Sequence, residues 1–135
     1  MSVDTVYRQV KSLFIWQSDK DRGQIGDYWD DFAARVRAGF TTHGDCEDFA
    51  LTCLIIGIED HGWDRSKCRI ARVKATRGLG LFDHAVAIYG GQVLDNRQRG
   101  PVPIEWLDYK WYDYSGIPIT KWRLYEGTFS LGYRG

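Results

Sequence analysis

The hydrophobic and polar positions divide the chain into a helical first half and a strand-rich second half. Residues 2–16 carry apolar side chains at helical spacing, which predicts a first helix with an inner face formed by Val3, Val6, Val10, Leu13 and Phe14. A polar stretch with two glycines, residues 18–27, predicts a loop. A short helix is expected over residues 29–38, ending at Gly39.

The most apolar run of the chain, residues 49–58, predicts a buried central helix. A capping signature precedes the run, because Asp45 can accept from the first turn and Asp48, three residues later, can reach back to it. The apolar residues surround nearly the whole helix, which is typical of a helix packed on all sides. Cys53 is therefore expected in the core, and His61-Gly62 is expected to end the helix.

The second half of the chain predicts antiparallel strands. Residues 68–76, with Ala71, Val73 and Ala75 on one face, and residues 84–89 each predict a strand. Gly90-Gly91 predicts a two-residue hairpin turn that leads into a third strand over residues 92–96. The aromatic tail adds a further strand candidate at residues 121–125. Helices followed by antiparallel strands indicate an α+β fold, and 135 residues fit one domain spanning residues 1–135.

Charge and composition exclude several classes of partner. Eighteen basic and eighteen acidic residues cancel and leave no basic stripe, which argues against nucleic acid. No apolar run reaches the roughly 20 residues that a membrane span needs, and the N-terminus has no apolar segment typical of a signal peptide. We therefore expect a cytoplasmic protein, with association with a virion as the alternative. Three cysteines favour free thiols over a disulfide framework, and without a paired Cys-x-x-Cys spacing no zinc site is expected.

Cys46 is the first candidate for chemistry, because it lies at the predicted N-terminus of the central helix. The unpaired N–H groups and the positive end of the helix dipole favour its thiolate, which is the nucleophilic form. The carboxylates of Asp45, Glu47 and Asp48 act in the opposite direction and raise the pKa of a thiol. A lowered pKa would then need a cationic histidine or a bound cation. The alternative interpretation is a structural cysteine at a crowded helix start.

The predicted hairpin places a histidine and a carboxylate together. With a two-residue turn, Tyr89 pairs with Gln92 and Val86 pairs with Asp95. Side chains alternate between the faces of a strand, so His84 and Asp95 become diagonal neighbours on one face, within reach of a hydrogen bond. The alternatives are a buried core histidine and an aspartate that serves only the turn.

The order of these residues is that of an acyl-transfer enzyme with a nucleophile, a base and a residue that orients the base. Cys46 would attack a carbonyl carbon, His84 would take its proton and later donate it to the leaving amine, and Asp95 would fix the tautomer of the imidazole. The backbone N–H of Cys46 is the default donor to the oxyanion.

The blocks that carry these residues resemble the bacterial transglutaminase-like cysteine proteinase family, whose members include a periplasmic protease that releases an adhesin. The resemblance covers residues 26–97, about half of the chain. It implies a papain-like α+β fold, a catalytic triad of Cys46, His84 and Asp95, and calcium held beside the nucleophile by Asp45 and Glu47. The matching blocks are Asp27-Tyr28-Trp29, Gly44-Asp45-Cys46-Glu47-Asp48-Phe49-Ala50, His84-Ala85-Val86 and Leu94-Asp95-Asn96.

Three functions are compatible with these observations. The first is a thiol-dependent hydrolase, a cysteine peptidase or amidase that acts on a protein or peptide substrate. The second is transfer of an acyl group to an amine, as transglutaminases perform. The third is a non-catalytic viral or phage module that keeps the fold and binds an assembly partner. The three residue types of the triad favour an enzyme.

Overall fold

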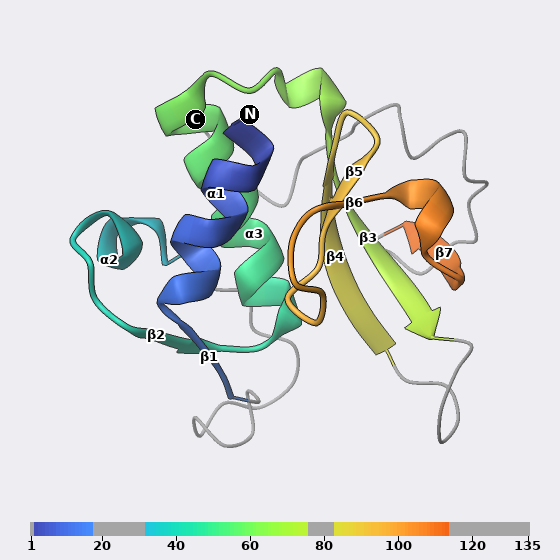
Figure 1. The fold of residues 1–135 in the computed structure, drawn as a ribbon, viewed down its shortest axis with the longest axis horizontal. Helices are drawn as coiled ribbons and strands as arrows, with labels where there is room; N and C mark the ends of the chain where they lie inside the picture. Colours follow the sequence, from blue (N-terminus) through green and yellow to red (C-terminus); the bar gives the residue numbers. More distant parts are fainter. Residues whose placement is uncertain (1, 18–31, 76–82, 114–135) are drawn as a thin grey trace.

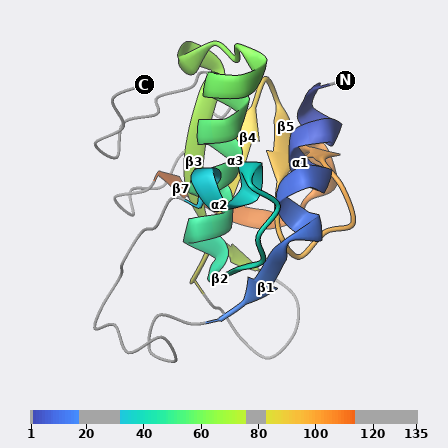
Figure 2. The ribbon, with the colours of Figure 1, turned by 90° about the vertical axis from the view of Figure 1, so that its left-hand side faces the viewer.

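Helices from the first half of the chain pack on one face of an antiparallel sheet formed by the second half. The computed structural model describes residues 2–17, 32–75 and 83–113 (Figure 1). Helix α1 (Ser2–Ser12) lies beside the central helix α3 (Cys46–His61), and α3 packs against strand β4 (Asp83–Tyr89). Figure 2 shows these layers from the side. The arrangement confirms the α+β class that the sequence predicts.

The sheet has five strands in the order β6-β5-β4-β3-β7, and every neighbouring pair is antiparallel. Two short 3₁₀ helices, η1 and η2, precede β3 and follow β6. The remaining bounds are β3 (Cys68–Ala75), β5 (Gln92–Leu94), β6 (Val102–Pro103), β7 (Tyr109–Asp113), η1 (Arg65–Lys67) and η2 (Ile104–Trp106).

Helix α3 has the ends that its sequence predicts. Asp45 and Asp48 form a capping box, in which each side chain accepts from the other residue's backbone N–H. At the other end Gly62 adopts the left-handed conformation, with a φ of 68°, that terminates many helices. These two local signals fix the helix between residues 46 and 61.

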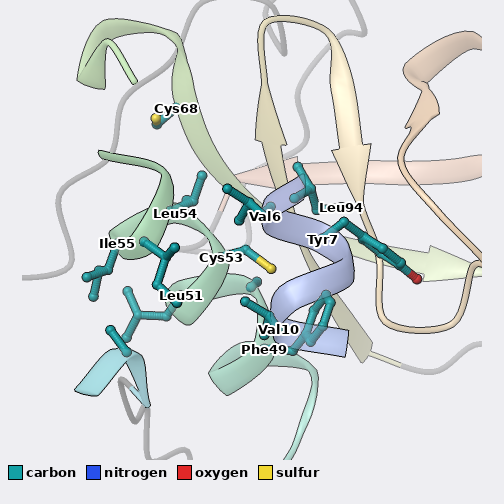
Figure 3. Close-up of a cluster of buried hydrophobic side chains, with 14 of the residues drawn as sticks. Val6, Tyr7, Val10, Phe49, Leu51, Cys53, Leu54, Ile55, Cys68 and Leu94 are labelled. Carbon is teal, nitrogen blue, oxygen red and sulfur yellow. The ribbon is translucent and has the colours of Figure 1, made fainter. Parts of the chain in front are cut away.

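The main core lies between α1, α3 and the sheet (Figure 3). The ring of Tyr7 meets the ring of Phe49 edge-on at 5.7 Å, and Cys53 is fully buried as predicted. A second cluster lies on the opposite face of the sheet and includes Val86, Ile88 and Trp111. Burial of each large side chain contributes roughly 1.5–3 kcal/mol, so both faces of the sheet support the fold.

The first helix ends four residues earlier than the apolar spacing predicts. Residues Phe14–Trp16 form strand β1, which pairs in parallel with β2 (Thr42–Gly44). The backbone N–H of Thr42 donates to the carbonyl oxygen of Leu13 at 2.6 Å, and the ring of Phe14 meets Phe49 edge-on. The apolar residues Leu13 and Phe14 fit both a longer helix and a strand that follows the helix. Only the pairing with β2 distinguishes these two structures.

Other bounds differ from the prediction by a few residues. Helix α2 covers Ala33–Arg37, and the expected helical residues 29–31 lie outside the described part of the chain. Strand β5 ends at Leu94 because residues 95–98 form a turn in which the N–H of Gln98 donates to the carbonyl of Asp95 at 3.0 Å. The strand expected at residues 121–125 also lies outside the described residues. Within residues 2–17, 32–75 and 83–113, no helix has both the length and the apolarity to cross a membrane.

Candidate active site

The capping box holds Cys46 at the first position of α3. The N–H of Asp48 donates to Oδ1 of Asp45 at 3.2 Å, and the N–H of Asp45 donates to Oδ2 of Asp48 at 3.1 Å. A Cβ on Gly44 would lie 2.7 Å from both Oδ2 of Asp48 and a ring carbon of Phe32, so only glycine fits before the cap. The nucleophile candidate is thus placed by a tightly packed first turn.

The thiol of Cys46 reaches the edge of strand β4. The N–H of Ala85 donates to Sγ of Cys46 at 3.3 Å. This donor is available because β5 ends at Leu94, opposite Ala87, and does not continue along β4. The sulfur therefore lies against the residue that directly follows His84, and Cys46 as a whole is 8% exposed.

His84 and Asp95 form a buried hydrogen-bonded pair. Nε2 of His84 lies 2.6 Å from Oδ1 of Asp95, and the two residues are 4% and 0% exposed. The predicted pairing of Tyr89 with Gln92 is present, and the turn between them has a positive φ at both glycines. The two-residue turn sets the register that brings the imidazole and the carboxylate together.

The carboxylate of Asp95 accepts from three donors. Oδ1 accepts from His84 and from the N–H of Arg97 at 2.9 Å, while Oδ2 accepts from the hydroxyl of Tyr109 at 2.6 Å. Burial acts to raise the pKa of Asp95, but the hydrogen bond and charge of His84, together with the donations from Tyr109 and Arg97, hold that pKa below its usual value. Asp95 is therefore ionised at neutral pH.

Helix α1 braces the turn that carries Asp95. The hydroxyl of Tyr7 donates to the carbonyl oxygens of Asp95, at 3.0 Å, and of Gln98. Nζ of Lys11 donates to the carbonyl oxygen of Asn96. Figure 3 shows the hydroxyl of Tyr7 directed away from the core cluster. The sequence analysis assigns no such contact to the first helix, because nothing local in the chain indicates which segment packs beside Tyr7 and Lys11.

The surroundings of Cys46 favour the protonated thiol. Burial raises the pKa of Cys46 well above its usual value, and the negative charge of Glu47 adds to this effect. The N–H of Ala85 acts in the opposite direction and is outweighed. Burial, which is the largest of these effects, and the carboxylates of Glu47 and Asp45 act in the same direction on the pKa of Cys46.

Asp45 and Glu47, the predicted calcium ligands, lie together beside the thiol. Burial raises the pKa of Glu47 to about 7, and a hydrogen bond with Asp45 and the negative charge of Asp45 contribute to this rise. The thiol of Cys46 donates to Oε2 of Glu47 at 3.3 Å. Two close carboxyl groups that hold a proton near neutral pH also suit a hard cation, which can replace that proton. In the described ranges no group of three or more His, Cys, Asp or Glu side chains could hold a metal.

The remaining residues of the predicted blocks take different places. Asp27-Tyr28-Trp29 lies outside the described residues. Cys53 and Cys68 are fully buried in the main core, away from the first turn of α3. Tyr109 is the site residue that sequence reasoning missed, because the tail offers several tyrosines and nothing local distinguishes this one.

The comparisons with known proteins identify the fold. No protein-family model matches the chain, and no curated protein matches it. Among solved structures, calcium-bound LapG of Legionella pneumophila superposes with a TM-score of 0.58 at 22% sequence identity, over 97% of this chain and 75% of LapG. At this identity the likeness shows the fold alone, and that fold agrees with the α+β fold that the sequence predicts.

Proposed function

We propose that this protein is a thiol-dependent hydrolase, a cysteine peptidase or amidase in which Cys46 is the nucleophile, His84 the base and Asp95 the residue that orients the base. The observation that carries this proposal is the buried 2.6 Å contact between His84 and Asp95, next to a thiol that accepts from the N–H of Ala85. The shared fold with LapG, together with the family resemblance noted in the sequence, supports this class of activity.

In this mechanism the two ring nitrogens of His84 have different tasks. Nε2 is bonded to Asp95, which fixes the tautomer with the proton on Nε2. Proton exchange with the thiol then falls to Nδ1. As Sγ attacks the carbonyl carbon, the thiol proton moves to Nδ1, and the same proton passes to the amine nitrogen as the C–N bond breaks. Water then attacks the thioester, gives a proton to Nδ1, and the C–S bond breaks with return of that proton to Sγ.

The raised thiol pKa selects between two modes of activation. A preformed thiolate–imidazolium pair would need a lowered pKa, whereas the pKa of Cys46 is raised. In the calcium-free protein, His84 would therefore act as a general base during attack. The N–H of Cys46 has no acceptor within α3, because it lies in the first turn of the helix, and we assign it to the oxyanion.

Calcium is proposed as the partner of the acidic pair. Asp45 and Glu47 would hold the ion with carboxylate oxygens, which are the ligands that calcium prefers. A bound divalent cation would supply positive charge beside the nucleophile. The shared position of the two carboxyl groups, and a structural neighbour that is calcium-bound, support this assignment.

Calcium binding is tested directly by calorimetric titration. The wild-type protein should bind calcium, and Glu47→Gln should weaken the binding at least about tenfold, because one charged ligand is lost. Glu105→Gln, which removes an exposed carboxylate on η2, serves as the matched control and should bind as the wild type does. Equal affinities in the wild type and Glu47→Gln, or an absence of binding at millimolar calcium, would exclude this pair as ligands.

The hydrolase proposal is tested by alkylation with limiting iodoacetamide at pH 7, followed by peptide mapping. We expect Cys46 to react before Cys53 and Cys68, which are fully buried. His84→Ala should slow the reaction of Cys46 by about 100-fold, because general-base assistance is worth about 10²–10⁴. His61→Ala changes a histidine at the far end of α3 and should leave the rate unchanged.

An equal rate in His84→Ala would show that Cys46 is a structural cysteine and would support a binding module instead.

If His84→Ala slows the reaction, a thioester formed on Cys46 from p-nitrophenyl acetate distinguishes the two enzymatic alternatives. Hydrolysis that is unaffected by added glycinamide supports a hydrolase, whereas capture of the acetyl group by the amine supports acyl transfer.

A further inference from the structure

The orientation of Asp95 depends on a residue from the far edge of the sheet. Tyr109 begins β7, which pairs with β3, while His84 belongs to β4 on the other side of β3. Val73 on β3 pairs with His84 on one side and with Trp111 on the other, so the three side chains lie on the same face of the sheet. Tyr109 is two residues before Trp111 on β7, so its side chain lies on that face as well. Tyr109 thus reaches Asp95 across the face that carries the imidazole.

Two ring contacts hold Tyr109 in place. Its ring centroid lies 6.3 Å from that of His84 and 5.7 Å from that of Trp111, edge-on in both cases. Trp111 is itself buried in the second core cluster. The phenol ring is therefore anchored by packing, and its hydroxyl is directed to Oδ2 of Asp95.

We propose that Tyr109 is a positioning residue that fixes the rotation of the Asp95 carboxylate and, through it, the tautomer of His84; this rests on the proposed function. His84 and Arg97 both bond Oδ1, so the hydroxyl of Tyr109 is the contact that holds Oδ2. Without it, the carboxylate can rotate so that neither oxygen stays in line with the Nε2–H bond, and the bias toward a proton on Nε2 weakens.

The phenol remains a donor over the working pH range. Burial raises the pKa of Tyr109 well above its usual value, and the hydrogen bond and charge of Asp95 raise it further. The hydroxyl is consequently protonated at neutral pH, where Asp95 is ionised, and the contact persists there.

The test compares Tyr109→Phe with Tyr112→Phe in protein labelled with ¹⁵N-histidine. Both changes remove one hydroxyl from β7 and keep the ring, but the ring of Tyr112 lies under Lys74. Long-range ¹H–¹⁵N spectra report which ring nitrogen carries the proton. In the wild type and in Tyr112→Phe, neutral His84 should be protonated on Nε2, whereas Tyr109→Phe should give averaged nitrogen shifts and slow the alkylation of Cys46 by about tenfold.

The two readouts separate this inference from the function on which it rests. An unchanged His84 spectrum and an unchanged alkylation rate in Tyr109→Phe would overturn the positioning role. If Tyr109→Phe changes the His84 spectrum but His84→Ala leaves the alkylation rate of Cys46 unchanged, Tyr109 still holds the His84–Asp95 pair and the hydrolase proposal is rejected. Thermal melts of both variants verify that the fold is intact, and Tyr109→Leu, which also removes the ring, should reproduce the averaged spectrum.

Discussion

Asparagine in place of Asp95 should slow the alkylation of Cys46 by about 100-fold, as much as the loss of His84 itself, because positioned proton transfer contributes about 10²–10⁴. The carboxylate accepts from His84, Tyr109 and Arg97, and it has no donor of its own when ionised. An amide must turn its NH₂ group toward one of these donors. It also removes the negative charge that would face an imidazolium during proton transfer, so His84 loses both its fixed tautomer and this stabilisation.

The measurement is the rate of modification of Cys46 by iodoacetamide at pH 7, with Asp4→Asn as the control. Asp4 is exposed on α1 and pairs with Arg8, so its change removes a carboxylate without affecting the site. A rate for Asp95→Asn within threefold of the wild type would remove Asp95 from the mechanism and leave it a structural role in the turn.

The same variant makes a prediction for stability against pH. The pKa of Asp95 is lower in the folded protein than in the unfolded chain, where an aspartate titrates near pH 3.9. The contribution to stability is therefore fully present above about pH 4 and is lost as the pH falls through the folded value. Urea unfolding between about pH 2 and pH 5 should show a smaller acid loss for Asp95→Asn than for the wild type.

Local signals in the sequence account for the parts of the site that were predicted. The central helix was predicted because Asp45 and Asp48 have capping-box spacing, and the His84–Asp95 contact because a two-residue turn sets the register of the hairpin. In both cases the residues that decide the geometry are close together in the chain. The side-chain period of each element, 3.6 residues in a helix and 2 in a strand, is then sufficient to predict which side chains lie together.

The parts that the sequence did not predict depend on contacts between distant segments. Strand β1 forms because Phe14–Trp16 finds Thr42–Gly44, about 28 residues further along the chain. Tyr109 reaches Asp95 only because β7 pairs with β3, on the opposite side from β4. Tyr7 and Lys11 brace the Asp95 turn from α1. Each contact requires knowledge of the strand order or the helix packing, which no local pattern contains.

The site draws its residues from four segments, so it exists only in the protein in which α3 is packed on the sheet. Cys46 is carried by α3, His84 by β4, Asp95 by the turn after β5 and Tyr109 by β7. Their relative positions are fixed by how α3 lies on the sheet. The end of α3 opposite Cys46 is held by Trp63, whose ring stacks on Tyr89 at the end of β4.

Gly57→Ala should be the most destabilising small change in α3. A Cβ at this position would overlap three ring atoms of Trp63. The ring cannot move easily, because it stacks on Tyr89 with centroids 4.3 Å apart and its Nε1 donates to Oγ of Ser2 at 3.0 Å. Overpacking of this kind costs about 3 kcal/mol, and alanine regains about 1 kcal/mol through its helix propensity. The net loss of about 2 kcal/mol corresponds to a fall in Tm of about 6–8 °C.

A double-mutant cycle identifies the cause of this loss. Gly100→Ala, where a Cβ meets no atom within 4 Å, should change the free energy of unfolding by less than about 0.5 kcal/mol. In a Trp63→Ala background the overlap is absent, so Gly57→Ala should become neutral or slightly stabilising. The same cost in both backgrounds would show that the glycine is required by the helix itself. At a temperature where Gly57→Ala is fully folded, Cys46 should react with iodoacetamide as in the wild type, since the change acts on the amount of folded protein and leaves the first turn of α3 intact.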